Sequence, residues 1–381
     1  MKPGLRSRVA ATLAALAMAL GAPSAGAQDG VIVYTLGRDT LAIEQFSRTP
    51  THLAGEMVSR SGAAVTRTQY DLTLANGRVT AAVVRRLQAD GKPLANTPTE
   101  YRFTFRADSV VRQSVWPDST QTRSFAAPNA FLSMPNFVYA PLEVLRAAPR
   151  HDSVPAVGTG SNAVGYLGLE AMPDGTQRVR GTSYPMLLSF DAGGLLQSVD
   201  GSFTASKSMG LRTQARLDIA ALARAMKPTG ALSPRTTAYA AFSQGPIFIN
   251  YASPAVRGRT VWGGLLIPLD SIWRVGANEA AHLATSKTIQ LGDMTLAPGL
   301  YTLWVQHTRA ATWLIVNRQV GQWGTSYDAA HDIGRVPMTL ATTPEHVEDF
   351  TITIRSLGQN RGAVDFAWGD KVATAAFTVR P

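Results

Sequence analysis

Residues 273–279 carry the side chains best suited to polar chemistry, in the order Trp-Arg-Val-Gly-Ala-Asn-Glu. Arg274 and Glu279 are five positions apart, so on a flat strand they would point to opposite faces. Gly276 and Asn278 tolerate unusual backbone angles, and a turn or bulge there would bring the guanidinium and the carboxylate to one side. These two groups would then either hold an anionic or hydroxyl-rich ligand or form an ion pair that fixes the turn.

Glu279 is also the candidate for general acid or base chemistry. Cleavage of a glycosidic bond normally needs two carboxylates about 5 to 10 Å apart. Asp270, Asp328 and Asp332 are each a candidate for the second, and the sequence alone does not pair any of them with Glu279. The chain has no phosphate-binding loop, no nucleophile elbow and no paired-histidine zinc motif. The catalytic residues therefore stay undefined, and a binding role is favoured over an enzymatic one.

The histidines show no metal-binding pattern. Glu279 and His282 have the i, i+3 spacing of a helical metal pair, but their segment has no helical pattern. A bound metal needs three or four converging ligands with supporting hydrogen bonds. We therefore predict neither a metal site nor a cofactor.

The second half of the chain has the pattern of a β-sandwich or jelly roll. Its strand signals recur at roughly 8 to 14 residues, with turn residues between them. They fall at residues 236–243, 247–251, 287–291, 299–307, 312–317, 350–356, 363–368 and 373–379. These strands are expected to position the polar segment 273–279.

Four motifs in this half occur in a specific order: SPAVRGRTVWG, WRVGANEA, LAPGLYTLW and NRQVGQWGTSYD. This order resembles the domain-of-unknown-function 2911 family over about residues 231–380. The resemblance implies a domain of that family in an exported setting, and it implies no mechanism. Together with the polar segment, it gives the ligand-binding candidates Trp273, Arg274, Asn278, Glu279, Arg259, Trp323 and Tyr327.

The first half predicts a curved antiparallel sheet. Residues 41–49, 65–74, 78–87 and 100–106 alternate apolar and polar side chains with a period near two, and Asn76-Gly77 is a two-residue hairpin signal. Short helices are expected at residues 141–148 and 217–226. Such a sheet is either packed solid or encloses an apolar cavity, as exported lipid carriers do, and that comparison is an analogy of fold only.

The start of the chain predicts export. Lys2, Arg6 and Arg8 precede an apolar run, and Ala25-Gly26-Ala27 is a small-residue cleavage site. We therefore expect a signal peptide at residues 1–27, an antiparallel β domain at 28–226, a linker at 227–234 and the β-sandwich domain at 235–381. The mature chain, periplasmic or extracellular, is expected to have no transmembrane segment.

Composition limits the partners. The whole chain has a formal net charge of +10 and no cysteine, so disulfides and thiol chemistry are excluded. Export argues against a nucleic-acid partner. The sequence gives no indication of the oligomeric state. The sequence thus predicts a binding or accessory module with a polar pocket around Arg274 and Glu279 and a small-molecule or glycan ligand. A hydrolase acting on glycans or esters and a purely structural envelope protein are the alternatives.

Overall fold

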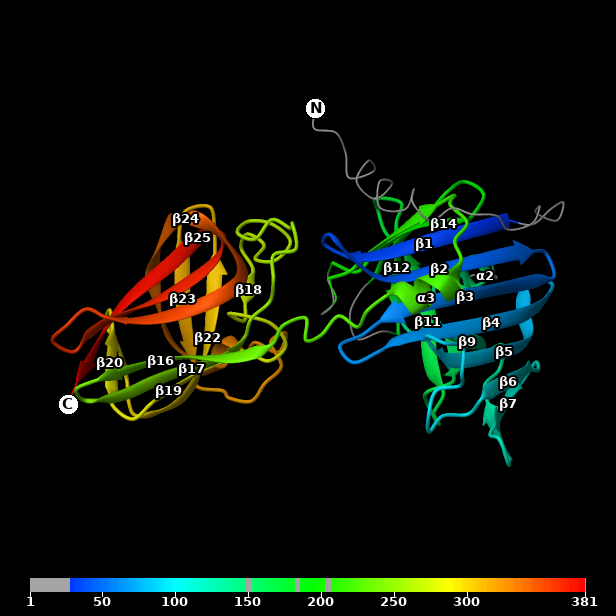
Figure 1. The fold of residues 1–381 in the computed structure, drawn as a ribbon, viewed down its shortest axis with the longest axis horizontal. Helices are drawn as coiled ribbons and strands as arrows, with labels where there is room; N and C mark the ends of the chain where they lie inside the picture. Colours follow the sequence, from blue (N-terminus) through cyan, green and yellow to red (C-terminus); the bar gives the residue numbers. More distant parts are fainter. Residues whose placement is uncertain (1–27, 148–152, 182–185, 203, 205–206, 381) are drawn as a thin grey trace. The chain divides into compact units, whose positions relative to one another are not determined.

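The computed structural model describes residues 28–147, 153–181, 186–202, 204 and 207–380, and the predicted signal peptide lies outside them. The chain divides after Gly230 into two compact units, each built on one large sheet (Figure 1). The prediction of a mostly β protein with large antiparallel sheets is confirmed. Within the described part of the chain, no helix is long and apolar enough to cross a membrane.

The N-terminal unit contains a 15-stranded sheet in the order β8-β7-β6-β5-β4-β3-β2-β1-β15-β14-β13-β12-β11-β10-β9. All neighbouring pairs are antiparallel except β9 and β10, which are parallel. The strands are β1 (Gln28–Leu36), β2 (Asp39–Thr49), β3 (His52–Arg60), β4 (Val65–Ala75), β5 (Arg78–Gln88), β6 (Glu100–Phe105), β7 (Ser109–Val115), β8 (Thr120–Ala126), β9 (Phe131–Ser133), β10 (Val154–Gly158), β11 (Gly165–Ala171), β12 (Gln177–Arg180), β13 (Leu187–Phe190), β14 (Leu196–Asp200) and β15 (Met209–Thr213).

In the described part of this unit, α2 and α3 cover opposite faces of the sheet. α3 (Ile219–Ala225) packs on the outer face, where Val31 and Val33 of β1 point. α2 (Leu142–Ala147) belongs to residues 127–147, here called the inner segment, which packs on the inner face against Ile32 and Tyr34. β1 is therefore buried on both faces, and its run of apolar residues lacks the period-two pattern that marks a half-exposed strand.

A buried carboxylate fastens the inner segment to the sheet. Glu44 of β2 is fully buried and accepts hydrogen bonds from the Tyr70 hydroxyl at 2.7 Å and the Tyr34 hydroxyl at 3.0 Å. It also accepts from the backbone N–H groups of Tyr139 at 3.0 Å and Ala140 at 3.2 Å. Burial raises the pKa of Glu44 to about 7, because the loss of hydration outweighs these four hydrogen bonds.

A second buried carboxylate reaches from the inner segment to the sheet. Glu143 of α2 is 1% exposed and pairs with Arg212 at 2.9 Å and with Arg48 at 3.3 Å. It also accepts from the Leu196 N–H at 2.8 Å. Since these partners come from β2, β14 and β15, α2 is held by strands on both sides of β1.

The C-terminal unit is a single 10-stranded sheet that folds over one core. Its order is β16-β17-β19-β22-β23-β24-β25-β20-β21, and β18 pairs with β22 outside this path. The strands are β16 (Arg235–Phe242), β17 (Gly245–Ala252), β18 (Ile272–Trp273), β19 (Ala281–Thr285), β20 (Thr288–Leu291), β21 (Met294–Leu296), β22 (Gly299–His307), β23 (Thr312–Asn317), β24 (Asp332–Ser356) and β25 (Arg361–Arg380), with a short 3₁₀ turn η1 (Ala329–His331).

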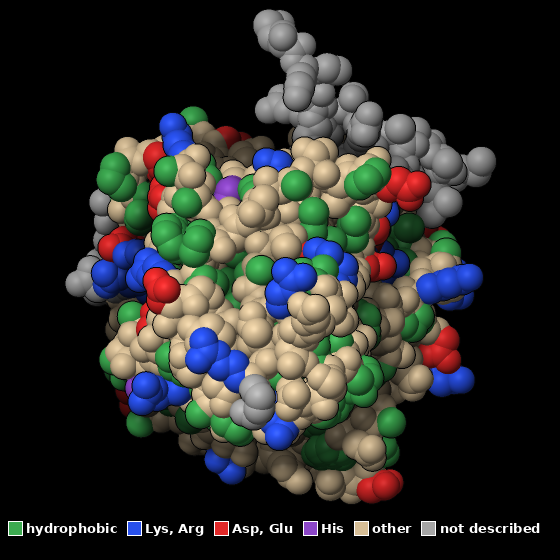
Figure 2. Space-filling model, turned by 90° about the vertical axis from the view of Figure 1, so that its left-hand side faces the viewer, with side chains coloured by type: hydrophobic (Ala, Val, Ile, Leu, Met, Phe, Trp, Pro, Cys, Tyr) green, Lys and Arg blue, Asp and Glu red, His purple; other side chains and the backbone are tan. Residues whose placement is uncertain are grey.

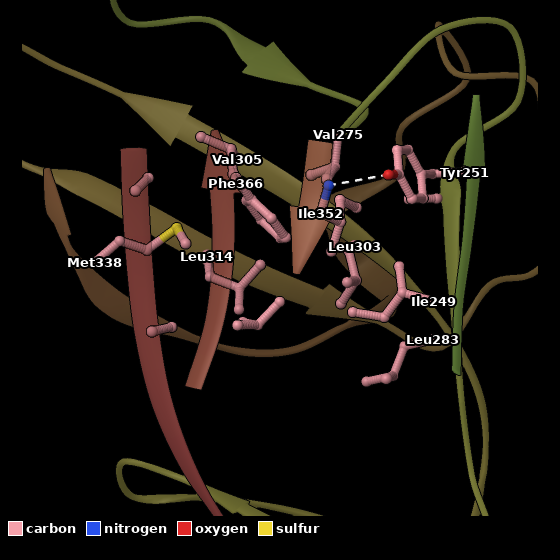
Figure 3. Close-up of a cluster of buried hydrophobic side chains, with 14 of the residues drawn as sticks. Ile249, Tyr251, Val275, Leu283, Leu303, Val305, Leu314, Met338, Ile352 and Phe366 are labelled. Carbon is pink, nitrogen blue, oxygen red and sulfur yellow. Dashed lines mark hydrogen bonds between the residues drawn. The ribbon is translucent and has the colours of Figure 1, made fainter. Parts of the chain in front are cut away.

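The fold of this sheet depends on the two long strands β24 and β25. Their apolar side chains face those of β17, β19, β22 and β23 across the core (Figure 3). The Ile352 N–H of β24 donates to the buried Tyr251 hydroxyl of β17 at 3.0 Å, next to a register shift in β24 (Figure 3). The three separate strands expected after residue 350 are thus parts of the two long strands β24 and β25.

Glu44 gives a testable pH dependence. Its folded pKa lies above its ordinary value near 4.5, so its contribution to stability is complete below about pH 4.5 and is lost as the pH rises through about 7. A pKa difference of this size corresponds to about 3 kcal/mol of unfolding free energy, because each pKa unit is worth about 1.4 kcal/mol. We expect Glu44→Gln to flatten the pH dependence of the unfolding free energy in this window. Chemical denaturation of the full chain between about pH 4.5 and about pH 8 measures it.

The matched control is Glu345→Gln, which removes an exposed glutamate and should keep the wild-type pH dependence. An unchanged pH slope in Glu44→Gln would show that the buried carboxylate does not titrate as described.

Candidate functional site

The turn at residues 273–279 has the irregular backbone expected from its glycine and asparagine. Gly276 has φ 140° and Asn278 has φ 61°, and the β-branched Val275 also lies at φ 54°. Val275 is fully buried in the core, which holds it in this unfavourable conformation. Packing of Val275 in the core therefore fixes the turn without a ligand.

Trp273 begins this turn and belongs to the core. It is 7% exposed, its ring stacks on Trp368 at 5.6 Å, and its Nε1 donates to the Gly276 carbonyl at 3.2 Å. The Trp273 side chain is therefore enclosed by other aromatic residues of the core.

Glu279 ends the turn and pairs with a residue that the sequence analysis did not name. Its carboxylate accepts from Arg235 Nη1 at 2.6 Å, and both side chains are 41% exposed. Arg235 Nε also donates to Asn250 Oδ1 at 3.0 Å. Arg235 lies 44 positions before Glu279, and the pairing of β16 with β17 brings Asn250 to the same place. Only the strand register reveals this cluster.

Asn250 belongs to a row of polar side chains that runs across the outer face of the sheet, and Glu279 lies beside this row. The paired residues of five strands in this row are Thr237, Asn250, His282, Thr302 and Asn317. Their neighbours Ile249, Leu283 and Leu303 point into the core on the opposite face. The row is thus a property of the outer face alone.

Residues 318–331, here called the covering segment, bury one end of this row. Thr302 and Asn317 are fully buried. Gln322 Nε2 donates to the Thr302 hydroxyl at 3.0 Å, and Asn317 Nδ2 donates to the Asp328 carbonyl at 2.8 Å. Thr237, Asn250 and His282 lie outside this cover and remain accessible, and we call them the open row.

His282 marks the boundary between the covered and open halves. Its Nε2 accepts a hydrogen bond from the Gly321 N–H at 3.0 Å, which requires a neutral ring at that nitrogen. Burial and the nearby Arg235 guanidinium lower the pKa of His282, so the neutral ring is favoured. His282 thereby fixes the edge of the covering segment.

An apolar row lies beside the open row, two residues further along each strand. The paired positions are Tyr239, Phe248, Ala284 and Leu300, and we call them the aromatic row. Tyr239 is 56% exposed and Phe248 is 40% exposed, and their ring centroids are 5.0 Å apart. Two residues along a strand correspond to about 7 Å, so polar and aromatic groups meet on one surface.

Comparison with family models identifies the unit that carries this surface. Residues 233–377 match the model described as "Protein of unknown function (DUF2911)". The C-terminal unit is a DUF2911 domain. This confirms the resemblance seen in the sequence motifs, and the N-terminal half matches no family model. No curated protein and no solved structure matches the chain.

The remaining candidates of the DUF2911 unit divide into two groups. Trp323 and Asn278 adjoin the site. Trp323 is 39% exposed, and its backbone forms an isolated antiparallel β-bridge with Glu279. The Gly324 N–H donates to the Asn278 carbonyl at 2.9 Å. Arg274 is packed beneath Gly324, since a Cβ at that glycine would overlap Arg274 Cδ. The covering segment therefore needs glycine at this position.

Arg259 and Tyr327 have architectural contacts. Arg259 Nη2 donates to the Ala255 carbonyl at 2.8 Å, which holds its own turn. The Tyr327 hydroxyl donates to Asp332 Oδ2 at 2.5 Å, and its ring packs on the buried Trp304. Burial and this hydrogen bond raise the pKa of Tyr327. Neither side chain reaches the open row through these contacts.

Charge on the unit is dispersed. Figure 2 shows Lys and Arg side chains scattered over the face that it displays, with acidic side chains between them. Among the described residues, no group of three or more His, Asp or Glu side chains is arranged to hold a metal ion. The polar chemistry of the surface therefore rests on the open row and the Arg235–Glu279 pair.

The Arg235–Glu279 pair contributes little to folding. An ion pair as exposed as this one contributes roughly 0 to 1 kcal/mol. We therefore expect Glu279→Gln to shift the unfolding free energy of the DUF2911 unit by less than about 1 kcal/mol. Tryptophan fluorescence during denaturation of the full chain reports on this unit, because six of the seven tryptophans lie in it.

Gly324→Ala is the comparison variant, because its Cβ would lie 2.5 Å from the Asn278 carbonyl oxygen. It should destabilise the unit by about 1 to 3 kcal/mol, the usual cost of overpacking. If Glu279→Gln were as destabilising as Gly324→Ala, the carboxylate would be a folding determinant and not a free binding group.

Proposed function

We propose that the chain is an exported binding protein whose DUF2911 unit binds a polar, ring-shaped ligand of the glycan type. The export expected from residues 1–27 is part of this proposal. The observation that supports the binding role is the meeting of the open row and the aromatic row on one accessible sheet face.

The two rows suit the two kinds of surface that a sugar ring presents. The C–H groups of a pyranose ring pack on aromatic side chains such as Tyr239 and Phe248. Its hydroxyl groups both donate and accept hydrogen bonds. The Thr237 hydroxyl, which accepts from the Asn250 amide at 3.0 Å and is held by it, can donate to one of them. Glu279 and Arg235 add a charged acceptor and a charged donor at the edge of the same face.

The surface is held in shape without a ligand. The side chains of both rows project from paired strands, and Gly321 and Gly324 anchor the covering segment to His282 and Asn278. A preformed surface loses little conformational freedom on binding, so weak individual contacts suffice. The surface proposed here lies next to the segment around Arg274 and Glu279, on the side of Glu279 that pairs with Arg235.

The hydrolase alternative has less support from the geometry. Asp332 already accepts hydrogen bonds from Tyr327 and Asn317, and Asp328 accepts from Ala330 and pairs with His331. Both carboxylates have local partners within the covering segment and its continuation into β24. Asp270, the third candidate, lies beside the end of β22, where its N–H donates to the His307 carbonyl at 2.8 Å. Binding is therefore the function that we favour for Glu279.

An oligosaccharide panel presented to the full chain tests this function. We expect at least one oligosaccharide to bind, and Tyr239→Ala and Asn250→Ala each to weaken its binding about tenfold, a loss of about 1.4 kcal/mol. The matched control is Tyr166→Ala, because Tyr166 is 62% exposed in the N-terminal unit. It should bind as the wild type does.

Equal effects of the three substitutions, or no binding by any panel member, would contradict the proposal. Release of shortened glycans by the wild type but not by Glu279→Gln would instead establish the hydrolase alternative.

A further inference from the structure

A second site lies in the N-terminal unit, where residues 129–131 and α2 of the inner segment meet the sheet. A cavity of about 380 Å³ opens there between the β4–β5 turn, the β6–β7 turn, residues 129–131 and α2. Ligand cavities in proteins usually have volumes of about 300 to 1,000 Å³, so this one can hold a small molecule.

The wall of the cavity is apolar. Its apolar side chains come from β5, β6, β9 and β10 of the sheet and from α2; they are Val79, Phe105, Phe131, Val144, Leu145 and Val154. Phe131 and Val144 are buried among the core residues of the unit, so the cavity continues the core surface. A flexible hydrocarbon chain fits such a wall, since it makes no demand for hydrogen bonds.

The mouth of the cavity is cationic. Arg78 and Arg106 are exposed residues of its lining, and none of the described residues of the lining is Asp or Glu. Arg78 also donates to Asn129 Oδ1, which places its guanidinium at the rim. Two guanidinium groups beside an apolar cavity are complementary to a carboxylate at the end of a hydrocarbon chain.

We propose that this cavity binds a single-chain amphiphile with a carboxylate head, with the acyl chain inside and the carboxylate at Arg78 and Arg106. The site is separate from the sheet face proposed for the glycan, and it does not depend on that proposal. The cavity keeps its shape because α2, which supplies Val144 and Leu145, is anchored through Glu143 to Arg212 and Arg48.

Isothermal titration calorimetry of the full chain tests the site with two probes below their micellar concentrations. Dodecanoate has the carboxylate head, and dodecyltrimethylammonium has the same chain with a cationic head. We expect one dodecanoate per chain, bound at least about tenfold more tightly than the cationic probe.

Two variants probe the two parts of the site. The double variant Arg78→Gln/Arg106→Gln should weaken dodecanoate binding about tenfold or more, and Arg123→Gln, which removes an exposed arginine outside the lining, should leave it unchanged. Ala130→Phe places a ring in the cavity and should abolish binding of both probes. Should Ala130→Phe fail to fold, the double variant still decides, because its two side chains are exposed.

Three results would overturn the proposal. They are no binding of dodecanoate, equal affinity for the two probes, and an affinity of the double variant equal to that of Arg123→Gln. Loss of glycan binding in the Tyr239→Ala variant would not affect this test, so the two proposals fail independently.

Discussion

The four hydrogen bonds to the buried Glu44 carboxylate are the interaction on which the N-terminal unit depends. A 15-stranded sheet has an apolar inner face that must be covered, and the inner segment packs its apolar side chains on that face. Buried backbone N–H groups need acceptors. The Glu44 carboxylate accepts from the N–H groups of Tyr139 and Ala140, and Glu143 of α2 accepts from the Leu196 N–H of β14. Buried carboxylates thus make a cysteine-free cover possible.

In the DUF2911 unit, part of the outer face of the sheet is also covered by a single segment of the chain. The covering segment buries Trp304, Thr302 and Asn317 and stops at the Gly321–His282 hydrogen bond. Both proposed sites lie beside these covers. Beside the inner segment there is an apolar cavity with arginines at its mouth. Beside the covering segment, polar and aromatic rows remain open. Binding surfaces therefore follow from how each sheet is covered.

The sequence patterns predicted the strands and turns that depend on neighbouring residues in the chain. Period-two alternation located β2, β4 and β5, and Asn76-Gly77 forms the turn between the last two with positive φ at both residues. β1 escaped detection because it is buried on both faces. The motif containing Glu279 was recognised, whereas its partner Arg235 was not, since a contact between residues 44 positions apart is set by strand register. The helix α2 of the inner segment was predicted, whereas the attachment of this segment to the sheet was not, since its partners lie on distant strands.

Residue-resolved amide hydrogen exchange of the full chain tests the central claim that both covers are fixed in the absence of ligand. The amides to follow are those of Tyr139, Ala140 and Leu196 in the N-terminal unit and of Gly321 and Gly324 in the DUF2911 unit. The account predicts that these amides exchange as slowly as those of the central strands of their own units. Exchange at the rate of exposed loops would show that the covers open freely, and it would contradict the account of both sites as preformed.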